Sequence, residues 1–341
     1  MVIDGALPWT VRTSARDKLG ISGRVLRGPA FVRVRRGVYV PAGADPQAPD
    51  NRIAAVTAGL PGHAAVGGWA AARILEREVA SDGLEVFDGG RCWAEGPAQH
   101  SSLGVVVPRL GAAASGGNAP VLICAARESR LTHRPDVRIF RSPVADDDVM
   151  PLGDVRVTSA LRTSFDLARL LPVGRAVVAL DRLVHLGTLE PAGLAEYARE
   201  RKGWRGASRV HRVLRLVDGR SESPQESVLR LLWIASGMPR PLANHVVRGS
   251  SGEFVARVDL IDPAAAVAGE YDGSWHSGGD RRSRDAHRRE SLLGLGVEPV
   301  HAASSDLASD ARAAEWQGRL RAAYRRARRR PSTRAWILTP S

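Results

Sequence analysis

One stretch of the sequence, VARVDLIDPAAAVAGEYDGSWH at residues 255–276, constrains the fold more than any other. Val258 and Leu260 alternate with Asp259, and residues 262–265 begin with Asp followed by Pro, which favour the first two positions of a turn. Alternation on both sides of a four-residue turn predicts an antiparallel β-hairpin whose side chains point to two opposite faces. This hairpin therefore has one apolar face, which must pack against other elements, and one acidic face.

The acidic face carries Asp259, Glu270 and Asp272. With the turn at 262–265, Asp259 lies opposite Ala268 and diagonal to Glu270, at ~7–8 Å. Like charges this close raise one another's pKa unless a cation lies between them, and Mg²⁺ takes carboxylate oxygens as ligands. We therefore expect Asp259 and Glu270 to hold Mg²⁺ or Mn²⁺, with Asp272 assisting. The alternative is that nearby arginines neutralise these acids in an ordinary ion network.

Two further side chains are candidates for the same site. His276 follows the second strand, where it could act as a general acid or base, or position an attacking water. A loop histidine can equally be a solvated side chain. Glu226 lies three residues after Ser223 in SPQES, which predicts a helix N-cap and a capping box. Capping explains Glu226 fully, although the first helix of a metal nuclease often supplies a carboxylate too.

The net charge of +13 and the pI of about 11.0 favour a polyanion as partner, because Lys and Arg set against phosphates release counterions. Only Lys18 and Lys202 are lysines among 49 basic residues, a bias that a GC-rich genome also produces. DNA as partner therefore stands beside the interpretation of a solvated basic surface. The arginines that we expect to contact phosphate are Arg33, Arg35, Arg36, Arg281, Arg282, Arg284 and Arg288.

The sequence shows no sign of a membrane or an oxidising compartment. No run reaches the ~18 apolar residues of a membrane helix, and the start, MVIDGALPWTVRTSARDKLG, lacks the pattern of a signal peptide. Cys92 and Cys124 form neither a metal-ligand spacing nor a disulfide framework. We therefore expect a cytoplasmic protein.

At 341 residues the chain is long enough for two or three domains, and its patterns predict a multidomain α+β protein. Residues 10–26 read as two short helices, and FVRVRRGVYVPAG predicts a basic hairpin, which together outline a winged helix. Residues 51–76 look helical, and the polar stretch 218–223 is a linker candidate. The expected domains are a winged-helix-like module at 1–80, a β-rich middle region at 81–157, a helical segment at 158–217 and an α/β/α domain at 221–330.

Residues 223–302 resemble a family grouped with the very-short-patch-repair endonucleases, within the restriction-endonuclease-like superfamily. The matching motifs are SPQES, ARVDL, EYDGSWH and SRDAHRRESLLGLG, followed by the strand VEPVH. The resemblance implies that Asp259 binds metal and that Trp275 and His276 lie in the active site. It also implies that Arg284, Asp285 and Arg288 belong to the basic helix of that family.

Residues 1–220 look like the amino-terminal part of actinobacterial proteins that carry this nuclease-like domain. Their first module is similar to the winged-helix domain of abortive-infection antitoxins, and the likeness rests on RVRRGVYVPAG and VTSALRTSFDLARLL.

One departure from the superfamily matters for function. Its usual pattern pairs the metal-binding acid with a lysine two residues on, whereas here Glu270-Tyr271-Asp272 has aspartate in that place. Our first hypothesis is a Mg-dependent endodeoxyribonuclease that hydrolyses phosphodiester bonds in DNA repair or phage defence. The alternative is a non-catalytic DNA-binding regulator of antitoxin type on a nuclease-derived scaffold. Whether a toxin or a second copy of the chain, as a homodimer, is its partner stays open.

Overall fold

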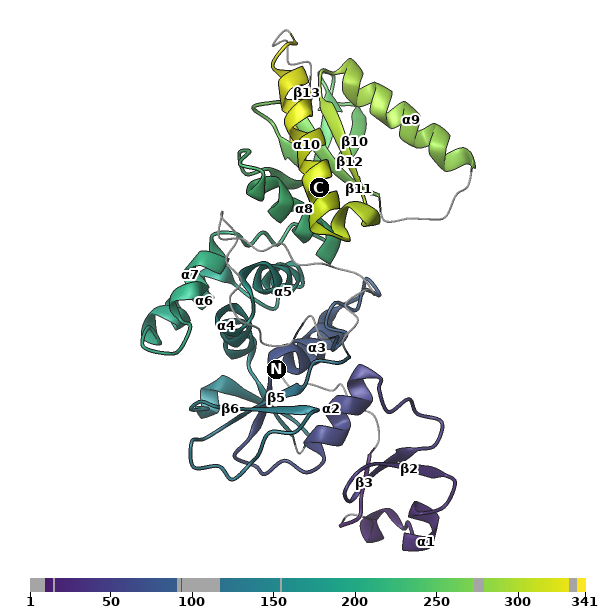
Figure 1. Cartoon of the computed structure of the whole chain (residues 1–341), viewed down its shortest axis with the longest axis vertical. Coiled ribbons are helices and arrows are strands. Elements are labelled where there is room, and N and C mark those ends of the chain that lie inside the picture. Colours follow the sequence, from purple (N-terminus) through teal and green to yellow (C-terminus); the bar gives the residue numbers. More distant parts are fainter. Residues whose placement is uncertain are drawn as a thin grey trace. The chain divides into compact units, whose positions relative to one another are not determined.

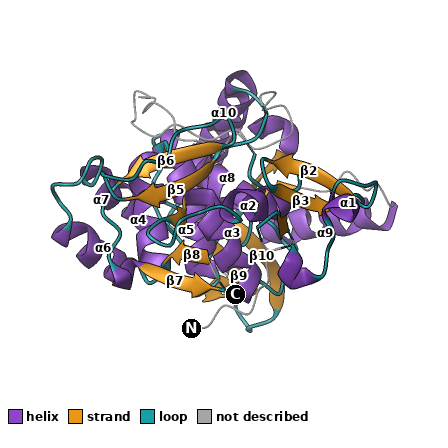
Figure 2. Cartoon of the chain, turned by 90° about the horizontal axis from the view of Figure 1, so that it is seen from below, coloured by secondary structure: helices purple, strands orange, loops and turns teal. Residues whose placement is uncertain are grey.

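The computed structural model describes residues 10–341 except 15, 91–92, 94–116, 154, 273–278 and 331–335, and for 18 and 279–286 it describes the backbone alone. The described residues form an α+β chain with three sheets, and helices and strands occur throughout (Figures 1 and 2). The chain divides into two compact units. The first comprises the described parts of Met1–Gly96, Gly116–Leu171 and Leu186–His211, and the second those of Pro172–His185 and Arg212–Ser341.

No helix in the described part of the chain combines the length and apolar character that crossing a bilayer requires.

The first unit begins with a small three-stranded sheet of order β1-β3-β2. Its elements are β1 (Val11–Arg12), η1 (Asp17–Leu19), α1 (Gly23–Leu26), β2 (Phe31–Arg35) and β3 (Val38–Pro41). The hairpin expected here is confirmed, with Gly37 at φ 75° in its turn. The helix expected before residue 20 is not an α-helix, because Val11 is buried in a strand that pairs with Tyr39, and only the 3₁₀ turn η1 follows.

The remainder of the first unit is a five-stranded sheet of order β6-β5-β4-β8-β7 with helices beside it. Residues 51–76 are not continuously helical, because Ala65–Gly67 form a strand that pairs with β5 and β8. The run LGVVVPRL lies outside the described residues. The elements are α2 (Pro49–Thr57), β4 (Ala65–Gly67), α3 (Gly68–Val79), β5 (Val121–Ala125), β6 (Val137–Arg141), η3 (Asp146–Asp148), β7 (Val149–Leu152), β8 (Val155–Thr158), α4 (Ala160–Leu170), α6 (Pro191–Glu200) and α7 (Ser208–Leu214), whose last residues are counted with the second unit.

The second unit is built on a sheet of order β12-β11-β10-β9-β13, in which only the β11–β12 pair is parallel. Its elements are α5 (Val173–His185), α8 (Pro224–Ala235), β9 (Leu242–Gly249), β10 (Phe254–Asp262), β11 (Val267–Asp272), α9 (Gly279–Gly294), β12 (Glu298–Ala303), η4 (Ser304–Leu307), α10 (Asp310–Ala327) and β13 (Trp336–Pro340). The expected order of helix, three-stranded meander, helix, strand and helix occurs from α8 to α10. The sequence interpretation missed β13, which pairs with β9.

Helices cover both faces of this sheet (Figure 1). On one face the indole of Trp233 in α8 lies 6.5 Å from that of Trp316 in α10. A Cβ on Gly269 of β11 would lie 3.0 Å from the Trp233 ring, so the sheet approaches α8 closely at this glycine. On the other face Leu292 of α9 packs in a cluster with Val258 and Ala268. The apolar surface of the predicted hairpin is therefore buried.

The polar stretch 218–223, expected to be a linker, is packed against the second unit. The Asp218 N–H donates to Asp181 Oδ1 in α5 at 2.7 Å, and Ser221 is 3% exposed. Arg230 of α8 is wholly buried and forms an ion pair with Asp181. A buried guanidinium requires a charged partner, so these residues fasten α5 to α8.

Candidate functional site

The turn between β10 and β11 is longer than the sequence predicts. Asp262 pairs with Val267, so residues 263–266 form the turn. Extending this register along the strands places Asp259 directly opposite Glu270, and not at the diagonal position that the shorter turn gives. The difference is two residues, an even number, so both carboxylates still point to the same face of the sheet.

These two carboxylates belong to a row of polar side chains that crosses four strands. The pairs on either side place Asn244 of β9 opposite Asp259, and Glu270 pairs with His301 of the parallel strand β12. We call Asn244, Asp259, Glu270 and His301 the polar row. The sequence interpretation did not single out Asn244 or His301, because their membership depends on which strands become neighbours. The one local signal was a polar residue within each of the strands NHVVRG and VEPVHA.

Asp259 is held where its ionised form is disfavoured. Pairing between β10 and β11 ends at Leu260 and Gly269, and beyond it Asp259 Oδ2 accepts the Tyr271 N–H at 2.6 Å. Burial raises the pKa of Asp259 to about 6, and the charges of Glu226 and Glu270 raise it further against the opposing Tyr271 N–H and Arg288. This carboxylate is therefore short of compensating positive charge.

Glu270 is 6% exposed and has cationic neighbours. Its Oε1 lies 2.9 Å from Arg288 Nη2 of α9, and its Oε2 lies 3.5 Å from Nδ1 of His301. Arg288 also donates a hydrogen bond to the backbone carbonyl of Arg257 in β10. The ion network weighed as an alternative is thus present at Glu270, and any metal bound there must share the carboxylate with Arg288.

Glu226 both caps its helix and lies near the polar row. The Ser223 hydroxyl accepts the Glu226 N–H at 3.2 Å, which confirms the predicted N-cap, and it donates to Glu226 Oε1 at 2.9 Å. Glu226 Oε2 accepts the N–H of Glu222 at 2.9 Å and an N–H of the Asn244 amide at 2.6 Å. Asn244 therefore links the helix cap to the polar row.

The other sequence candidates for the carboxylate site divide into described and undescribed residues. Asp272 ends β11 as an exposed side chain and shares the face of Glu270 by alternation. His276 and Trp275 lie outside the described residues. In the described ranges no three His, Cys, Asp or Glu side chains gather closely enough to enclose a metal ion. Arg281, Arg282, Arg284 and Asp285 lie in α9, where only the backbone is described.

Two grooves lined by basic side chains open beside the polar row. The first has a volume of about 560 Å³ and lies between β10 and α9, with Phe254, Arg257 and Arg288 among its lining residues. The second, of about 310 Å³, lies beside β12 and includes Arg319 and His301. Arg288 and His301 also contact Glu270, so each groove adjoins the polar row.

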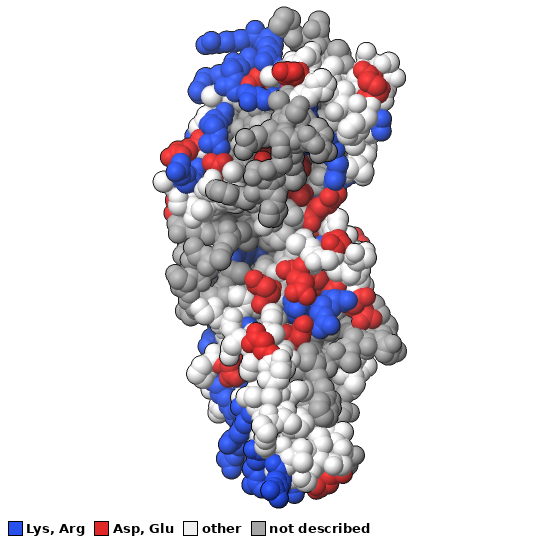
Figure 3. Space-filling model, turned by 90° about the vertical axis from the view of Figure 1, so that its right-hand side faces the viewer, with Lys and Arg blue, Asp and Glu red and all other residues white. Residues whose placement is uncertain are grey.

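The amino-terminal arginines occupy different settings. Arg33 and Arg36 are exposed, in a part of the surface where basic side chains gather (Figure 3). Arg35 Nε donates to Asp136 Oδ2 at 3.0 Å, so its charge is already compensated. Cys124 is buried as a free cysteine, and Cys92 lies outside the described residues.

Comparisons with known proteins give a limited likeness. No family model and no solved structure matches the chain. Two proteins of Mycobacterium tuberculosis are similar, the uncharacterized proteins MT2308 and Rv2248 of two strains, each 33% identical over 140 residues. The match covers 41% of this chain and 51% of each relative, so the chain spans about half the length of the curated relatives it matches.

Proposed function

We propose that the second unit is a restriction-endonuclease-like domain related to the very-short-patch-repair endonucleases, and that it hydrolyses phosphodiester bonds of DNA with a divalent metal. The observation that carries this proposal is the pair of carboxylates Asp259 and Glu270, which face the same side from adjoining strands. Winged-helix-like binding by the amino-terminal hairpin, with Arg33 and Arg36 at phosphates, and a cytoplasmic location complete the proposal.

The charges in the polar row fit a hard divalent cation. Asp259 is partly buried with a pKa of about 6, and two further carboxylates contribute to that rise, so added positive charge would be stabilising there. Asp259 and Glu270 would hold Mg²⁺ or Mn²⁺, both of which prefer carboxylate oxygens. When bound, the ion lowers the pKa of a coordinated water and neutralises charge on phosphoryl oxygens.

The protein's own residues would position the substrate. Arg257 and Arg288 line the groove between β10 and α9, where guanidinium groups can contact phosphate with two hydrogen bonds each. Asn244 fixes the Glu226 carboxylate beside the polar row. Asp272 would assist from the end of β11, and we propose His276 as the group that moves a proton.

Two observations favour a second candidate, a non-catalytic DNA-binding regulator of antitoxin type. Asp272 stands where the superfamily has lysine, and Arg288 already pairs with Glu270 at 2.9 Å. In this version the polar row is a structural ion network, the arginine-lined grooves bind DNA without cutting it, and a toxin or a second copy of the chain is the partner.

DNA cleavage distinguishes the two candidates. Supercoiled plasmid incubated with the full chain and Mg²⁺ or Mn²⁺ should be nicked or linearised, and Asp259→Asn should slow this by more than roughly 100-fold, the upper end of what an outer-shell change costs a metal site. Glu290→Gln, an exposed change on α9, is the matched control and should cleave normally. Intact plasmid with the wild type, together with its retention in a gel shift, would contradict the nuclease and favour the regulator.

A further inference from the structure

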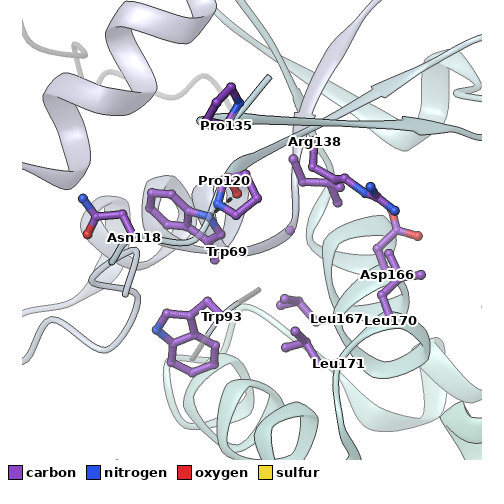
Figure 4. A pocket seen from close by; sticks show the side chains of 12 residues that line it. Trp69, Trp93, Asn118, Pro120, Pro135, Arg138, Asp166, Leu167, Leu170 and Leu171 are labelled. Atoms are coloured by element: carbon purple, nitrogen blue, oxygen red, sulfur yellow. Dashed lines mark hydrogen bonds between the residues drawn. The ribbon is translucent and has the colours of Figure 1, made fainter. Parts of the chain in front are cut away.

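A cavity in the first unit is separate from the polar row and has no part in the proposed hydrolysis. It has a volume of about 410 Å³ and is enclosed by the start of α3, strands β5 and β6, the end of α4 and Trp93 (Figure 4). Small-molecule sites in proteins occupy roughly 300–1,000 Å³ and combine apolar walls with a few polar groups. The cavity is of that kind.

Two buried indoles form fixed walls. Trp69 Nε1 donates to the Pro120 carbonyl at 2.8 Å, and Trp93 Nε1 donates to Asp88 Oδ1 at 3.1 Å. Both indole N–H groups are therefore satisfied by the protein, and the rings contribute their apolar surfaces to the cavity. Gly89, at φ 69°, lies so close that a Cβ there would be 2.6 Å from Trp69. The ring is therefore held from behind by a position that favours glycine.

The polar groups lie at opposite ends of the cavity. Figure 4 shows Asn118 at one end and Arg138 with Asp166 at the other, with the indoles and Leu167 between them. Asn118 uses one N–H on Gln47 at 3.0 Å, and its amide can form further hydrogen bonds with a ligand.

The end that holds Asp166 favours an anion in spite of the carboxylate. Asp166 lies 2.9 Å from Arg162 Nε and 2.6 Å from Arg169 Nη2, so two guanidinium groups surround one carboxylate. Arg138 adds a third positive charge at the cavity wall. An anionic group placed here meets net positive charge, which strengthens its hydrogen bonds.

We propose that this cavity binds a flat heteroaromatic anion of the size of a nucleoside monophosphate. The ring packs against Trp69 and Trp93, as aromatic rings pack in offset or edge-to-face contacts. Its polar edge bonds to Asn118, and its anionic group lies at Arg138. A purely aliphatic ligand would leave the amide and guanidinium unused, and a bare anion would leave the indole walls uncovered.

Calorimetric titration of the full chain tests this proposal, with AMP, GMP, CMP and UMP as probes and the matching nucleosides and ribose 5-phosphate as partial ligands. At least one nucleotide should bind, and both partial ligands should bind at least roughly tenfold more weakly, the loss expected for one charge-assisted hydrogen bond. Arg138→Gln should weaken the nucleotide by a similar factor. Arg127→Gln, an exposed arginine outside the cavity, should leave binding unchanged.

Filling the cavity gives an independent check. Leu167→Trp places an indole in the space between the two ends, and a variant with wild-type circular dichroism should bind no nucleotide. The proposal is overturned if none of the four nucleotides binds, if ribose 5-phosphate binds as tightly as the nucleotide, or if Arg138→Gln or folded Leu167→Trp binds like the wild type. These outcomes do not depend on DNA cleavage by the second unit.

Discussion

Asp259 is a side chain whose ionised form works against the fold. Its carboxylate is desolvated between β9 and β11, faces Glu270 and has Glu226 nearby, and one backbone N–H and Arg288 only partly compensate. A structural residue at this place could be neutral. The ionised acid is useful only where a cation or a proton is to be bound.

The first prediction at this scale concerns stability and pH. Because the folded pKa of Asp259, about 6, lies above its usual 3.8, the protonated carboxyl stabilises the fold. This contribution is fully present below pH 3.8 and is lost as the pH rises through about 6. Asp259→Asn keeps the acceptor for the Tyr271 N–H but cannot ionise, so we expect the variant to be more stable than wild type by roughly 2 kcal/mol at pH 8.

Urea unfolding in metal-free buffer at pH 8 and pH 5 measures this difference, which should shrink at pH 5, where much of the wild-type carboxyl is protonated. Glu290→Gln should show no comparable pH dependence. Equal stabilities of Asp259→Asn and wild type at pH 8 would mean that Asp259 is adequately compensated, and would remove the electrostatic reason for a metal.

Helix α9 brings a competing cation to the polar row. Arg288 pairs with Glu270 and also donates to the Arg257 carbonyl, so it ties α9 to both hairpin strands. We expect Arg288→Gln to bind Mn²⁺ several-fold more tightly in calorimetric titration, since removing a like charge from a carboxylate is worth on the order of 1 kcal/mol. The same variant should bind DNA more weakly and with a smaller salt dependence.

Arg289→Gln, the neighbouring exposed change, is the control for metal binding. Weaker Mn²⁺ binding by Arg288→Gln would show instead that Arg288 holds Glu270 in the position that the metal requires.

Local patterns predicted the elements well where neighbours in the sequence decide them. Ser223 and Pro224 mark the start of α8, and alternation marks β10 and β11. The turn after Asp262 was predicted too short, because its length depends on how the strands pair and Ala266 adopts φ 53°, a conformation that alanine rarely takes. The carboxylate pair survived that error only because the register changed by an even number.

The parts that could not be predicted depend on distant pairing. His301 joins Glu270 through the parallel β11–β12 pair, and residues 336–340 become a strand only because β9 offers an open edge. Residues 65–67 likewise look helical in isolation, yet pair with two strands from later in the chain. Contacts of this range leave no local signature beyond a polar residue inside an apolar strand.

Each unit of the whole molecule has its own buried ion pair. Arg162 and Asp166 lie 2.9 Å apart in the first unit, both fully buried, and Arg230 pairs with Asp181 in the second. Breaking one partner of a buried pair leaves an uncompensated charge and costs roughly 3–5 kcal/mol. Scanning calorimetry should therefore show that Arg162→Ala lowers the melting of the first unit and Arg230→Ala that of the second.

Exposed pairs supply matched controls for this prediction. Arg199 with Glu196 in the first unit and Arg312 with Glu315 in the second are more than half exposed, so their alanine variants should change stability by less than about 1 kcal/mol. If Arg162→Ala and Arg230→Ala lowered one shared transition equally, the two units would melt as a single cooperative body.

Strand β13 covers the free edge of β9, and Ser341 Oγ, just beyond it, donates to the Asn244 carbonyl at 3.0 Å. Asn244 is a member of the polar row, so an affinity tag fused after Ser341 would emerge beside the candidate catalytic residues. A tag at the opposite terminus, cleaved before assay, avoids that interference, and deletion of residues 336–340 would leave β9 open to pairing with another molecule and so to aggregation.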